Sequence, residues 1–455
     1  MSGSGGTHGE GVVGPGAGAS ATGAGAARRR RRWLRYAGIG TAVVLVAAAG
    51  AGWAVYEKLN GNITSDDDTA AELARYEKER PTSLVRDAQN ILLIGSDSRS
   101  GDGNAKYGRD SGTERSDTTI LLHLAANRRS ATAVSLPRDL MVDVPSCRRP
   151  DGTRTAPLFA MFNYAFQSGG SACTIRTVEK LTRVRVDHHM VVDFHGFKDM
   201  VDAVDGVEVC LKEPIDDPAA KLRLPAGKVR LNGEQALGYV RARKTIGDGS
   251  DTDRMDRQQR FLGALVNKVR SNDVLLNPVK LYPVLDAATS SLTTDPGLAS
   301  LRGLYDLVRG MRNIPTERVQ FLTVPRESYA YNANRDQLVE PEAEKLFERL
   351  RTDAPLEVTK ELPEDSGTQW SRTAPDETEG TENTEDTSGD AHGDSYGYGP
   401  FRQGDEGQEG RDGRHSGPAE PQNGTSDGKR AAEPSPATSP APTFRGNTAA
   451  EDACG

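Results

Sequence analysis

The sequence predicts an α/β domain in which helices cover a central mixed β-sheet, behind one N-terminal membrane-spanning helix and between disordered tails. Three features of the 455-residue chain lead to this prediction. Apolar runs of strand length recur in its middle part, and segments with helical periodicity alternate with them. Polar, low-complexity sequence occupies both ends. Because the apolar runs are continuous, they indicate strands covered on both faces within one large domain.

The N-terminal segment, residues 1–36, is predicted to be a disordered basic tail. Its first part consists almost entirely of Gly, Ala, Ser, Thr and Val. Such a segment has too few large apolar side chains to offset the entropy that is lost when a chain becomes ordered. Five consecutive arginines follow at residues 28–32.

Residues 37–56 carry no charge and predict a transmembrane helix. At ~1.5 Å per residue, this stretch covers the ~30 Å hydrocarbon core of a bilayer. Four aromatic residues stand where interfacial anchors are expected: Trp33, Tyr36, Trp53 and Tyr56. A cleaved signal peptide is the alternative, but the length and the aromatic flanks favour an uncleaved single-pass anchor of the cell membrane. The arginine run places the N-terminus in the cytoplasm and the working domain outside.

Three further segments follow the span. Residues 57–87 are charged and only weakly periodic, so they predict a stalk that leads to a domain at residues 88–358. Residues 359–455 are rich in Gly, Pro, Ser, Thr, Asp and Glu and predict a disordered, acidic extracellular tail. The net charge of −8 owes much to this tail and therefore says little about what the domain binds.

Within the domain, apolar runs and helical periodicity define the expected elements. The predicted strands are residues 91–95, 118–124, 131–136, 189–194, 206–211 and 319–323. The predicted helices are residues 163–184, 196–204, 233–243, 254–269, 278–292 and 298–311.

The four cysteines include no CxxC pair, which argues against a cysteine metal site. An oxidising exterior favours one structural disulfide, and Cys147 with Cys173 closes the shortest loop among the three cysteines of the domain. Cys210 is then expected to be a small buried hydrophobic residue. The connectivity stays open at this point.

Charged residues of both signs converge at one edge of the predicted sheet. If the second and third strands form a hairpin, Asp117 before one and Arg138 after the other lie at the same end. If the first strand runs parallel to the third, Asp97 and Arg99 emerge there too, and Arg115 precedes the second strand. Arginine forks together with Mg²⁺ held by one or two carboxylates suit a diphosphate. Turn-capping aspartates and solvated arginines are the alternative, which is weaker for the whole set than for any one residue.

A second basic group surrounds a Gly/Asp-rich loop. Arg241 and Arg243 end one predicted helix, and Arg254 and Arg257 share a face of the next because they are three residues apart. Either Asp251 or Asp253 is a candidate N-cap of that helix. Gln258 is a candidate phosphate ligand or a solvent-facing side chain.

Other polar residues give weaker signals. Asn163 is open between a helix N-cap and an amide of the site. The pair His188 and His189 lacks a third ligand nearby in sequence, which makes zinc unfavourable, and His123 and His195 are expected to be structural. No GxSxG motif occurs within the predicted domain, and the chain has no GxxxxGK[ST] or HExxH motif, so the common hydrolase, P-loop nucleotide and zinc-protease classes are disfavoured.

Eight segments stand in one order along the chain: NILLIGSDSR, RSDTTILLHL, SLPRDL, FNYAF, HHMVVDFHGF, VDGVEV, LNGEQALGYVRARK and DRMDRQQR. This order resembles the LytR-CpsA-Psr family. The resemblance implies a membrane-anchored transferase that moves teichoic acid, capsule, arabinogalactan or a related polymer from polyprenyl diphosphate to peptidoglycan through a phosphodiester. It also implies a deep apolar pocket for the polyprenyl chain. The insert GDGNAKYGRDSGTE departs from the family pattern, and the Gly/Ala-rich composition with arginine runs suits an actinobacterium.

The resemblance assigns roles by matching motif positions. Asp97 and Asp117 are expected to arrange Mg²⁺, for which Mn²⁺ can substitute. The expected diphosphate ligands are Arg99, Arg138, Arg241, Arg243 and Arg254, together with the more weakly matched Arg257 and Gln258, and Arg115 joins them from the sheet-edge cluster.

The expected reaction is attack by a peptidoglycan hydroxyl on the phosphorus nearer the glycan, with the arginines and Mg²⁺ neutralising charge. Asp97 or Asp251 is the candidate general base. A receptor for lipid diphosphates and a hydrolase that releases the polymer are the alternatives. Nucleic-acid binding conflicts with the extracellular position of the domain, so the expected partners are the lipid-linked donor, peptidoglycan and the membrane.

Overall fold

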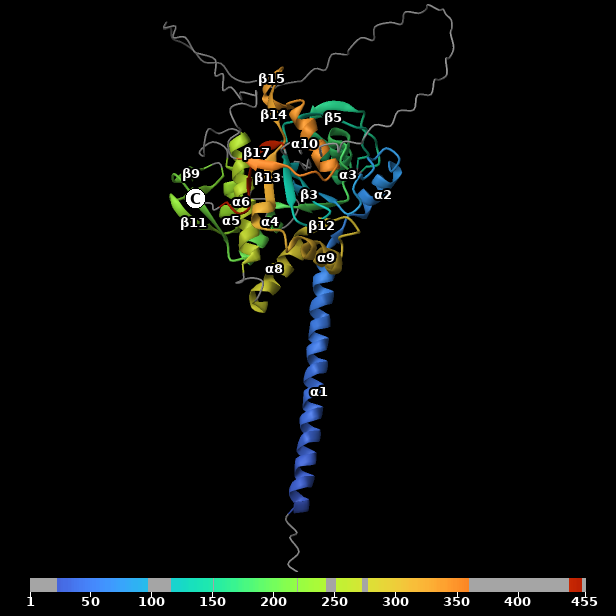
Figure 1. The fold of residues 1–455 in the computed structure, drawn as a ribbon, viewed down its shortest axis with the longest axis vertical. Helices are drawn as coiled ribbons and strands as arrows, with labels where there is room; N and C mark the ends of the chain where they lie inside the picture. The colour runs from blue at the N-terminus through green and yellow to red at the C-terminus, as the bar shows by residue number, and fades with distance from the viewer. Residues whose placement is uncertain are drawn as a thin grey trace, which may run out of the picture. The chain divides into compact units, whose positions relative to one another are not determined.

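The computed structural model describes residues 23–96, 116–149, 151–218, 220–242, 251–271, 277–359 and 442–451 (Figure 1). The helices are α1 (Gly23–Asn62), α2 (Asp67–Arg75), α3 (Asn163–Thr182), α4 (Phe194–Ala203), α5 (Gly233–Arg241), α6 (Asp251–Arg270), α8 (Pro278–Ser291), α9 (Leu301–Met311), the 3₁₀ helix η2 (Thr316–Arg318) and α10 (Glu342–Arg351).

The strands of the main sheet are β1 (Thr64–Ser65), β2 (Gln89–Ser96), β3 (Ser116–Leu124), β4 (Ala131–Leu136), β7 (His188–Val192), β12 (Leu292–Thr294), β13 (Val319–Thr323), β16 (Glu357–Thr359) and β17 (Thr443–Thr448). Two-stranded sheets are made by β5 (Met141–Val144) with β6 (Leu158–Met161), β8 (Val207–Leu211) with β11 (Gly227–Leu231), β9 (Ile215–Asp217) with β10 (Leu222–Leu224), and β14 (Arg326–Tyr329) with β15 (Asn332–Leu338).

The main sheet is mixed, with the order β1-β12-β7-β2-β3-β4-β13-β17-β16. Strand β3 is antiparallel to both β2 and β4, while β7 is parallel to β2 and β13 is parallel to β4. Therefore β2, β4, β7 and β13 all run in the same direction, and their carboxyl ends share one edge. The predicted hairpin and the predicted parallel relation of the first and third strands are both confirmed.

Helices pack on the sheet as the continuous apolar runs predict. Strands β2, β3 and β4 carry fully buried residues such as Leu92, Leu121 and Val134, and α3 and α10 cover them through Ile175 and Phe347. A separate apolar cluster joins α4, α5 and α6 to the β8–β11 and β9–β10 pairs. The α/β fold class is therefore confirmed.

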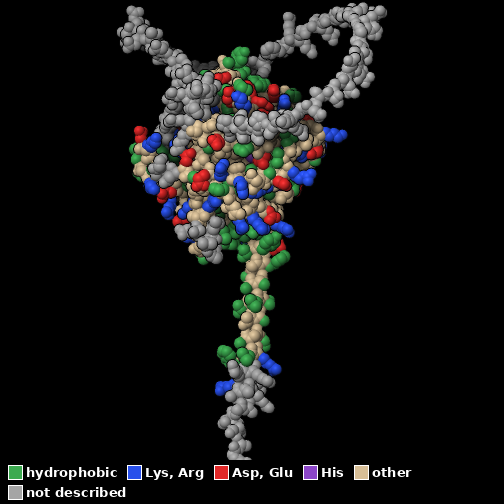
Figure 2. All heavy atoms as spheres, viewed as in Figure 1, with side chains coloured by type: hydrophobic (Ala, Val, Ile, Leu, Met, Phe, Trp, Pro, Cys, Tyr) green, Lys and Arg blue, Asp and Glu red, His purple; other side chains and the backbone are tan. Residues whose placement is uncertain are grey.

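The membrane-spanning helix is longer than the sequence predicts. Helix α1 continues past Tyr56 to Asn62, and its part from Trp33 to Asn62 is long and apolar enough to cross a membrane. No residue of the most apolar stretch of this part is buried against the protein. Figure 2 shows hydrophobic side chains along it. Burial against protein does not explain this apolar surface, so α1 is a membrane anchor.

The predicted stalk is instead part of the folded unit, which corrects the boundary at residue 88. Leu59 and Leu73 are buried, and β1 pairs with β12. Arg80 lies against α3, where its Nε and Nη2 atoms donate to the Glu179 carboxylate at 3.0 and 2.7 Å. The weak periodicity of this segment reflects contacts made by single residues rather than by one continuous helical face.

Asp66 links the segment after the anchor to the sheet, and we expect the stability that this link contributes to depend on pH. Its carboxylate caps α2 by accepting from the Thr69 amide, and it lies 3.1 Å from Nε2 of His189. Burial alone would raise the pKa of Asp66, but hydrogen bonds from His189 and Thr69 outweigh it and lower the pKa from 3.8 to about 2.

A lowered folded-state pKa stabilises the protein above the unfolded value, so this contribution is present above about pH 4 and is lost as pH falls towards 2. Asp66→Asn is expected to remove about 2 kcal/mol of unfolding free energy at neutral pH and nearly nothing at pH 2. Denaturant unfolding across this pH range measures the difference. Asp68→Asn, an exposed residue of the same first turn, is the control. Equal losses for the two variants would contradict the assignment.

The C-terminal part of the chain returns to the sheet, which corrects the prediction of one tail over residues 359–455. Strand β17 pairs antiparallel with β13 and parallel with β16, and its Phe444 is buried in the core. Residues 360–441 and 452–455 lie outside the described residues, as do residues 1–22 of the predicted basic tail.

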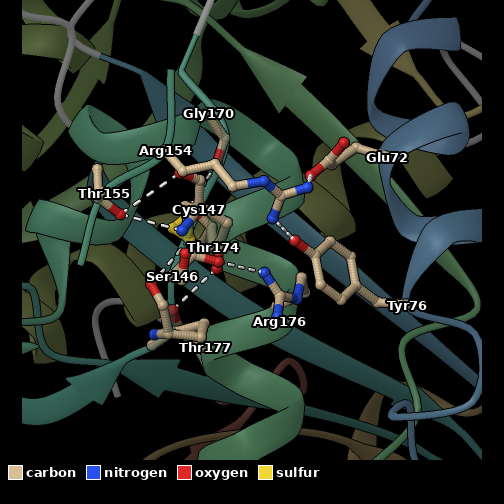
Figure 3. The surroundings of a disulfide bond; sticks show 12 residues. Glu72, Tyr76, Ser146, Cys147, Arg154, Thr155, Gly170, Thr174, Arg176 and Thr177 are labelled. Carbon is tan, nitrogen blue, oxygen red and sulfur yellow. Dashed lines mark hydrogen bonds and ion pairs between the residues drawn. A yellow bond between two sulfur atoms is a disulfide. The ribbon is translucent and has the colours of Figure 1, made fainter. Parts of the chain in front are cut away.

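The predicted disulfide is confirmed. Cys147 and Cys173 are bonded, and their bond joins the loop between β5 and β6 to α3 (Figure 3). Around it, Arg176 donates to the Ser146 carbonyl at 2.6 Å and stacks over the ring of Tyr76. The disulfide and the Arg176 contacts therefore hold together three segments that are distant in sequence.

Cys210 is disulfide-bonded, so the expectation that it is a free buried residue was wrong. In β8 the residues Val207, Val209 and Leu211 are buried, and the two-residue period of a strand turns Cys210 to the other, partly exposed face. That face leaves its sulfur available for bonding.

Removing the Cys147–Cys173 bond is expected to lower stability measurably. The two residues are 26 apart in sequence, and closing a loop of this length constrains the unfolded chain by about 3.5 kcal/mol. Cys147→Ala combined with Cys173→Ala should lower the denaturation midpoint accordingly, and treatment with reductant should add little further loss from this site. An unchanged midpoint in the double variant would contradict the prediction.

Candidate functional site

The candidate site lies at the shared carboxyl edge of the parallel strands. Ser96 ends β2, Asp193 follows β7, Arg138 follows β4 and Thr323 ends β13. Ligand sites commonly form where strand ends and their loops meet. The antiparallel strand β3 begins at the same edge and brings Asp117 there.

Asp117 and Arg138 meet as the sequence predicts. Nη1 of Arg138 lies 3.0 Å from Oδ1 of Asp117, and its Nε lies 3.3 Å from Oδ2 of Asp139. The side chains of Arg138 and Asp117 keep 21% and 30% of their surface exposed, so this charged pair is accessible to a ligand. The Arg138 carbonyl accepts from the Asn163 amide at 3.0 Å, which fixes the loop that carries the guanidinium.

Asn163 is not an N-cap. Helix α3 starts at Asn163 itself, the N-cap position is Phe162, and no side chain caps this helix end. Asn163 is buried, and its backbone amide contacts the Arg138 loop. The alternative of a site amide stays a prediction.

Asp139 and its partners were not singled out by the sequence. The Asp139 carboxylate forms an ion pair with Arg335 at 3.7 Å. The Asp139 carbonyl accepts a hydrogen bond from the backbone amide of Asp336 at 3.1 Å. Arg326 pairs with the buried carboxylate of Asp336 in the same hairpin. The β14–β15 hairpin thus braces the loop that carries Arg138. Only the position of Asp139 next to Arg138 in SLPRD could have indicated it.

Helix α6 brings the second basic group towards the same edge. The Gln259 side-chain amide donates to Ser135 and Thr323, at the ends of β4 and β13, over 3.3 and 3.0 Å. The neighbouring arginines, Arg254 and Arg257, keep only 6% and 5% of their surface exposed. Burying two cations on one helix beside a sheet edge lowers the folding stability unless anions or carbonyl oxygens lie against them.

Arg257 and Gln258 contact the end of α5. Arg257 donates to the Ala242 carbonyl, and Gln258 donates to the Val240 carbonyl at 3.1 Å. Burial lowers the pKa of the Arg257 guanidinium, which Tyr239 and Asp253 partly offset. These contacts hold α5 and α6 together. A direct role of either side chain at a diphosphate stays a prediction.

Arg241 ends α5 and reaches the start of α4. Its guanidinium carbon lies 4.5 Å from the ring centroid of Phe194, a cation–π distance. Phe194 follows the carboxyl end of β7, so Arg241 lies at the edge that carries Arg138. The structure therefore brings Asp117, Arg138 and Arg241 to one side of the sheet.

Several predicted site residues cannot be placed. Asp97, Arg99, Arg115 and Arg243 lie outside the described residues. Asp251 is the first residue of α6, and its side chain is not described, so neither its capping role nor its role as a base is tested.

Each histidine in the described part of the chain lies beside a carboxylate. His188 lies 3.1 Å from Asp295, and His195 lies 3.4 Å from Asp199. His123 is held between Asn90 and Asp353, and burial lowers its pKa although Asp353 opposes the shift. Among the described residues, no group of three or more His, Cys, Asp or Glu side chains could hold a metal ion.

A cavity of about 870 Å³ opens beside the end of β2. Its wall includes Ser96 and Asp193 of the sheet edge, Glu72 of α2, and Arg148 and Arg149 near the disulfide. Apolar side chains such as Phe166 and Val191 share the wall with these polar ones. The deep apolar pocket that the resemblance implies therefore stays a prediction.

Comparison with known proteins gives consistent matches. A family model described as the LytR_cpsA_psr family matches residues 55–352. The "Probable cell wall biosynthesis protein LcpB" of Corynebacterium glutamicum is 37% identical over 62% of this chain and 66% of its own. The "Cell wall biosynthesis protein LcpA" of the same organism is 34% identical over 52% of this chain and 50% of its own.

A third relative is more distant. The "Polyisoprenyl-teichoic acid--peptidoglycan teichoic acid transferase TagV" of Bacillus subtilis is 26% identical over 68% of this chain and 74% of its own. The match spans less than two thirds of the length of each Corynebacterium relative.

Proposed function

This chain belongs to the LytR_cpsA_psr family, and from that premise we propose that it transfers a glycopolymer from a polyprenyl-diphosphate carrier to peptidoglycan. The observation that carries the proposal is the Asp117–Arg138 pair at a sheet edge that Arg241 also reaches. Guanidinium forks bind phosphate oxygens in pairs, and a diphosphate offers several of them. The names of the relatives, which refer to cell wall biosynthesis and teichoic acid transfer, support the same chemistry.

The reaction is a phosphoryl transfer. A hydroxyl of the wall glycan attacks the phosphorus nearer the polymer, the bond to the bridging oxygen breaks, and polyprenyl phosphate leaves. The new bond makes a phosphodiester between polymer and wall. Arg138 and Arg241 bind the diphosphate and neutralise charge that grows on its oxygens in the transition state. The acceptor proton passes to a carboxylate, for which Asp97 and Asp251 are the candidates.

Asp117 offers carboxylate oxygens of the kind that a hard divalent ion takes. Mg²⁺ takes oxygen ligands and often only one or two protein carboxylates, with phosphate and water completing its shell. Asp117 would hold the ion with Asp97, because only its Oδ1 atom pairs with Arg138 and its side chain is partly exposed. When bound, the ion supplies positive charge to the diphosphate.

Asp117→Asn tests the metal assignment. It is expected to raise the Mg²⁺ concentration for half-maximal transfer by about 10- to 100-fold, because a ligand loses its charge. The rise in melting temperature caused by Mg²⁺ should shrink as well, which is a readout independent of turnover. Asp143→Asn, an exposed carboxylate on β5, is the control. An unchanged Mg²⁺ requirement in Asp117→Asn would contradict the role.

The orientation of the anchor forms part of the proposal. The arginine run at residues 28–32 precedes the span, so the positive-inside rule puts the N-terminus in the cytoplasm and the folded domain in the cell envelope. Lipid-linked donors and peptidoglycan meet on that side of the membrane.

The function is tested with the full chain in proteoliposomes, a synthetic polyprenyl-diphosphate glycan and soluble peptidoglycan fragments. Covalent glycan–peptidoglycan conjugates that require the protein and Mg²⁺ are the expected product. Free glycan phosphate without conjugate would identify a hydrolase. Donor binding without turnover would identify a receptor, and either result would overturn the proposal.

A further inference from the structure

Helix α9 carries more apolar surface than the core beneath it covers. Leu307 and Met311 pack against a small cluster around Ile314. On the adjacent stripe, Tyr305 and Val308 are 59% and 58% exposed, Leu301 and Leu304 are partly buried, and no residue of α9 is fully buried. The stripe consists of Leu301, Leu304, Tyr305 and Val308, whose i, i+3, i+4, i+7 spacing makes one continuous helix face.

This α9 stripe is tied to the end of the membrane anchor. The Leu301 amide donates to Oδ1 of Asn60 at 3.0 Å, so α9 begins beside α1. The predicted span ends at Tyr56, and four further residues advance a helix by only about 6 Å. Figure 1 shows α9 at the point where α1 joins the rest of the domain. The first turn of α9 must therefore lie close to the boundary between lipid and water.

Helix α8 fixes the same geometry from a second side. Lys58 lies 3.0 Å from both the Tyr282 hydroxyl and a carboxylate oxygen of Asp286, and Asn62 reaches Asp286 and Thr289 over 3.0 and 3.3 Å. These contacts follow one another in the same order on both helices, so α8 and the end of α1 run in the same direction. The amino end of α8, where Val279 is 81% exposed, accordingly points towards the membrane.

The side chains beside the α9 stripe are those of an interfacial helix. Arg302, Arg309 and Arg312 are exposed next to it, and Tyr305 combines an aromatic ring with a polar end. Basic residues flanking an apolar helix face, with an aromatic at the boundary, are typical of helices that lie in the headgroup region of a bilayer. Hydrophobic side chains gather around the junction with α1, and Lys and Arg side chains lie near them (Figure 2).

We propose that the α9 stripe lies on the bilayer surface and inserts Tyr305 and Val308 into its headgroup region. A lipid surface is favoured over another protein because α1 already places the first turn of α9 close to lipid. The contact fixes the tilt of the domain, so that the site meets lipid-linked substrates at a constant height. The inference rests on α1 spanning the membrane and does not depend on the transferase activity.

The test uses the full chain in liposomes with single cysteines labelled by an environment-sensitive fluorophore. Cys147, Cys173 and Cys210 are disulfide-bonded, and labelling of the unsubstituted protein gives the background. Labels are placed at Tyr305→Cys and Val308→Cys. Tyr331→Cys is the matched control, because this tyrosine is 88% exposed in the β14–β15 turn, away from α1 (Figure 1). Lipids that carry a spin label near the headgroup serve as quenchers.

Insertion to ~5–10 Å predicts that emission at positions 305 and 308 falls by about half or more with the spin-labelled lipid and that position 331 is unaffected. Equal, weak quenching at all three positions would overturn the proposal. A blue-shifted but unquenched signal that grows with the protein-to-lipid ratio would also overturn it, since it would identify a second copy of the chain as the partner.

Discussion

Arg138→Ala is expected to reduce the rate of glycan transfer by about two to three orders of magnitude, because it removes a preorganised cation at the diphosphate. The loss should fall mainly on kcat if Arg138 binds charge that develops in the transition state, and on KM if it holds the ground-state diphosphate. Its pairing with Asp117 at 3.0 Å and the bracing of its loop by Asn163 place the guanidinium before the substrate arrives.

Two further variants separate charge from geometry at this position. Arg138→Lys keeps the positive charge but loses the planar fork, so it should recover only part of the activity. Arg129→Ala removes an exposed arginine from the β3–β4 turn at the opposite edge of the same sheet and should leave transfer unchanged. Full activity of Arg138→Ala would contradict a role of this sheet edge in the transfer reaction.

The largest loss of stability is expected from Arg80→Ala. Glu179 is 3% exposed and accepts three hydrogen bonds from Arg80 and one from the Val186 amide. Removing the arginine leaves a buried carboxylate without its main partner, which typically costs about 3–5 kcal/mol. The pair joins the segment after the anchor to α3, so its loss should also loosen that segment.

The structure offers a matched control for this prediction. Arg185 pairs with Glu77 at 2.7 Å, but Glu77 is 56% exposed, and exposed pairs are worth about 0–1 kcal/mol. Denaturant unfolding should therefore distinguish Arg80→Ala from Arg185→Ala. Arg80→Met combined with Glu179→Met should recover part of the loss, because no buried charge then remains. Similar losses for the two alanine variants would contradict the assignment.

Long, continuous patterns made the sheet predictable from sequence. Residues 131–136 and 319–323 were predicted with the bounds that β4 and β13 have, because each is a short run rich in apolar and β-branched residues with a proline within the next two positions. The meeting of Asp117 and Arg138 followed from the antiparallel hairpin alone. Local geometry fixes such a contact, so no knowledge of distant segments was needed.

Contacts between distant segments could not be predicted in this way. The sequence of β17, TFRGNT, has no apolar alternation, and its pairing with β13 is decided by tertiary context rather than by propensity. The same limit applies to Arg257 and Gln258. The three-residue spacing of Arg254 and Arg257 indicates a shared helix face. It does not indicate that the carbonyls of Ala242 and Val240 would be the partners of Arg257 and Gln258.

The most direct test of the proposed function identifies the lipid product of the reaction by mass spectrometry. Attack on the phosphorus nearer the glycan releases polyprenyl monophosphate and leaves one phosphate in the glycan–peptidoglycan conjugate, which is the predicted result. Release of polyprenyl diphosphate with a phosphate-free glycosidic link in the conjugate would contradict the account, because the reaction would then occur at the sugar carbon.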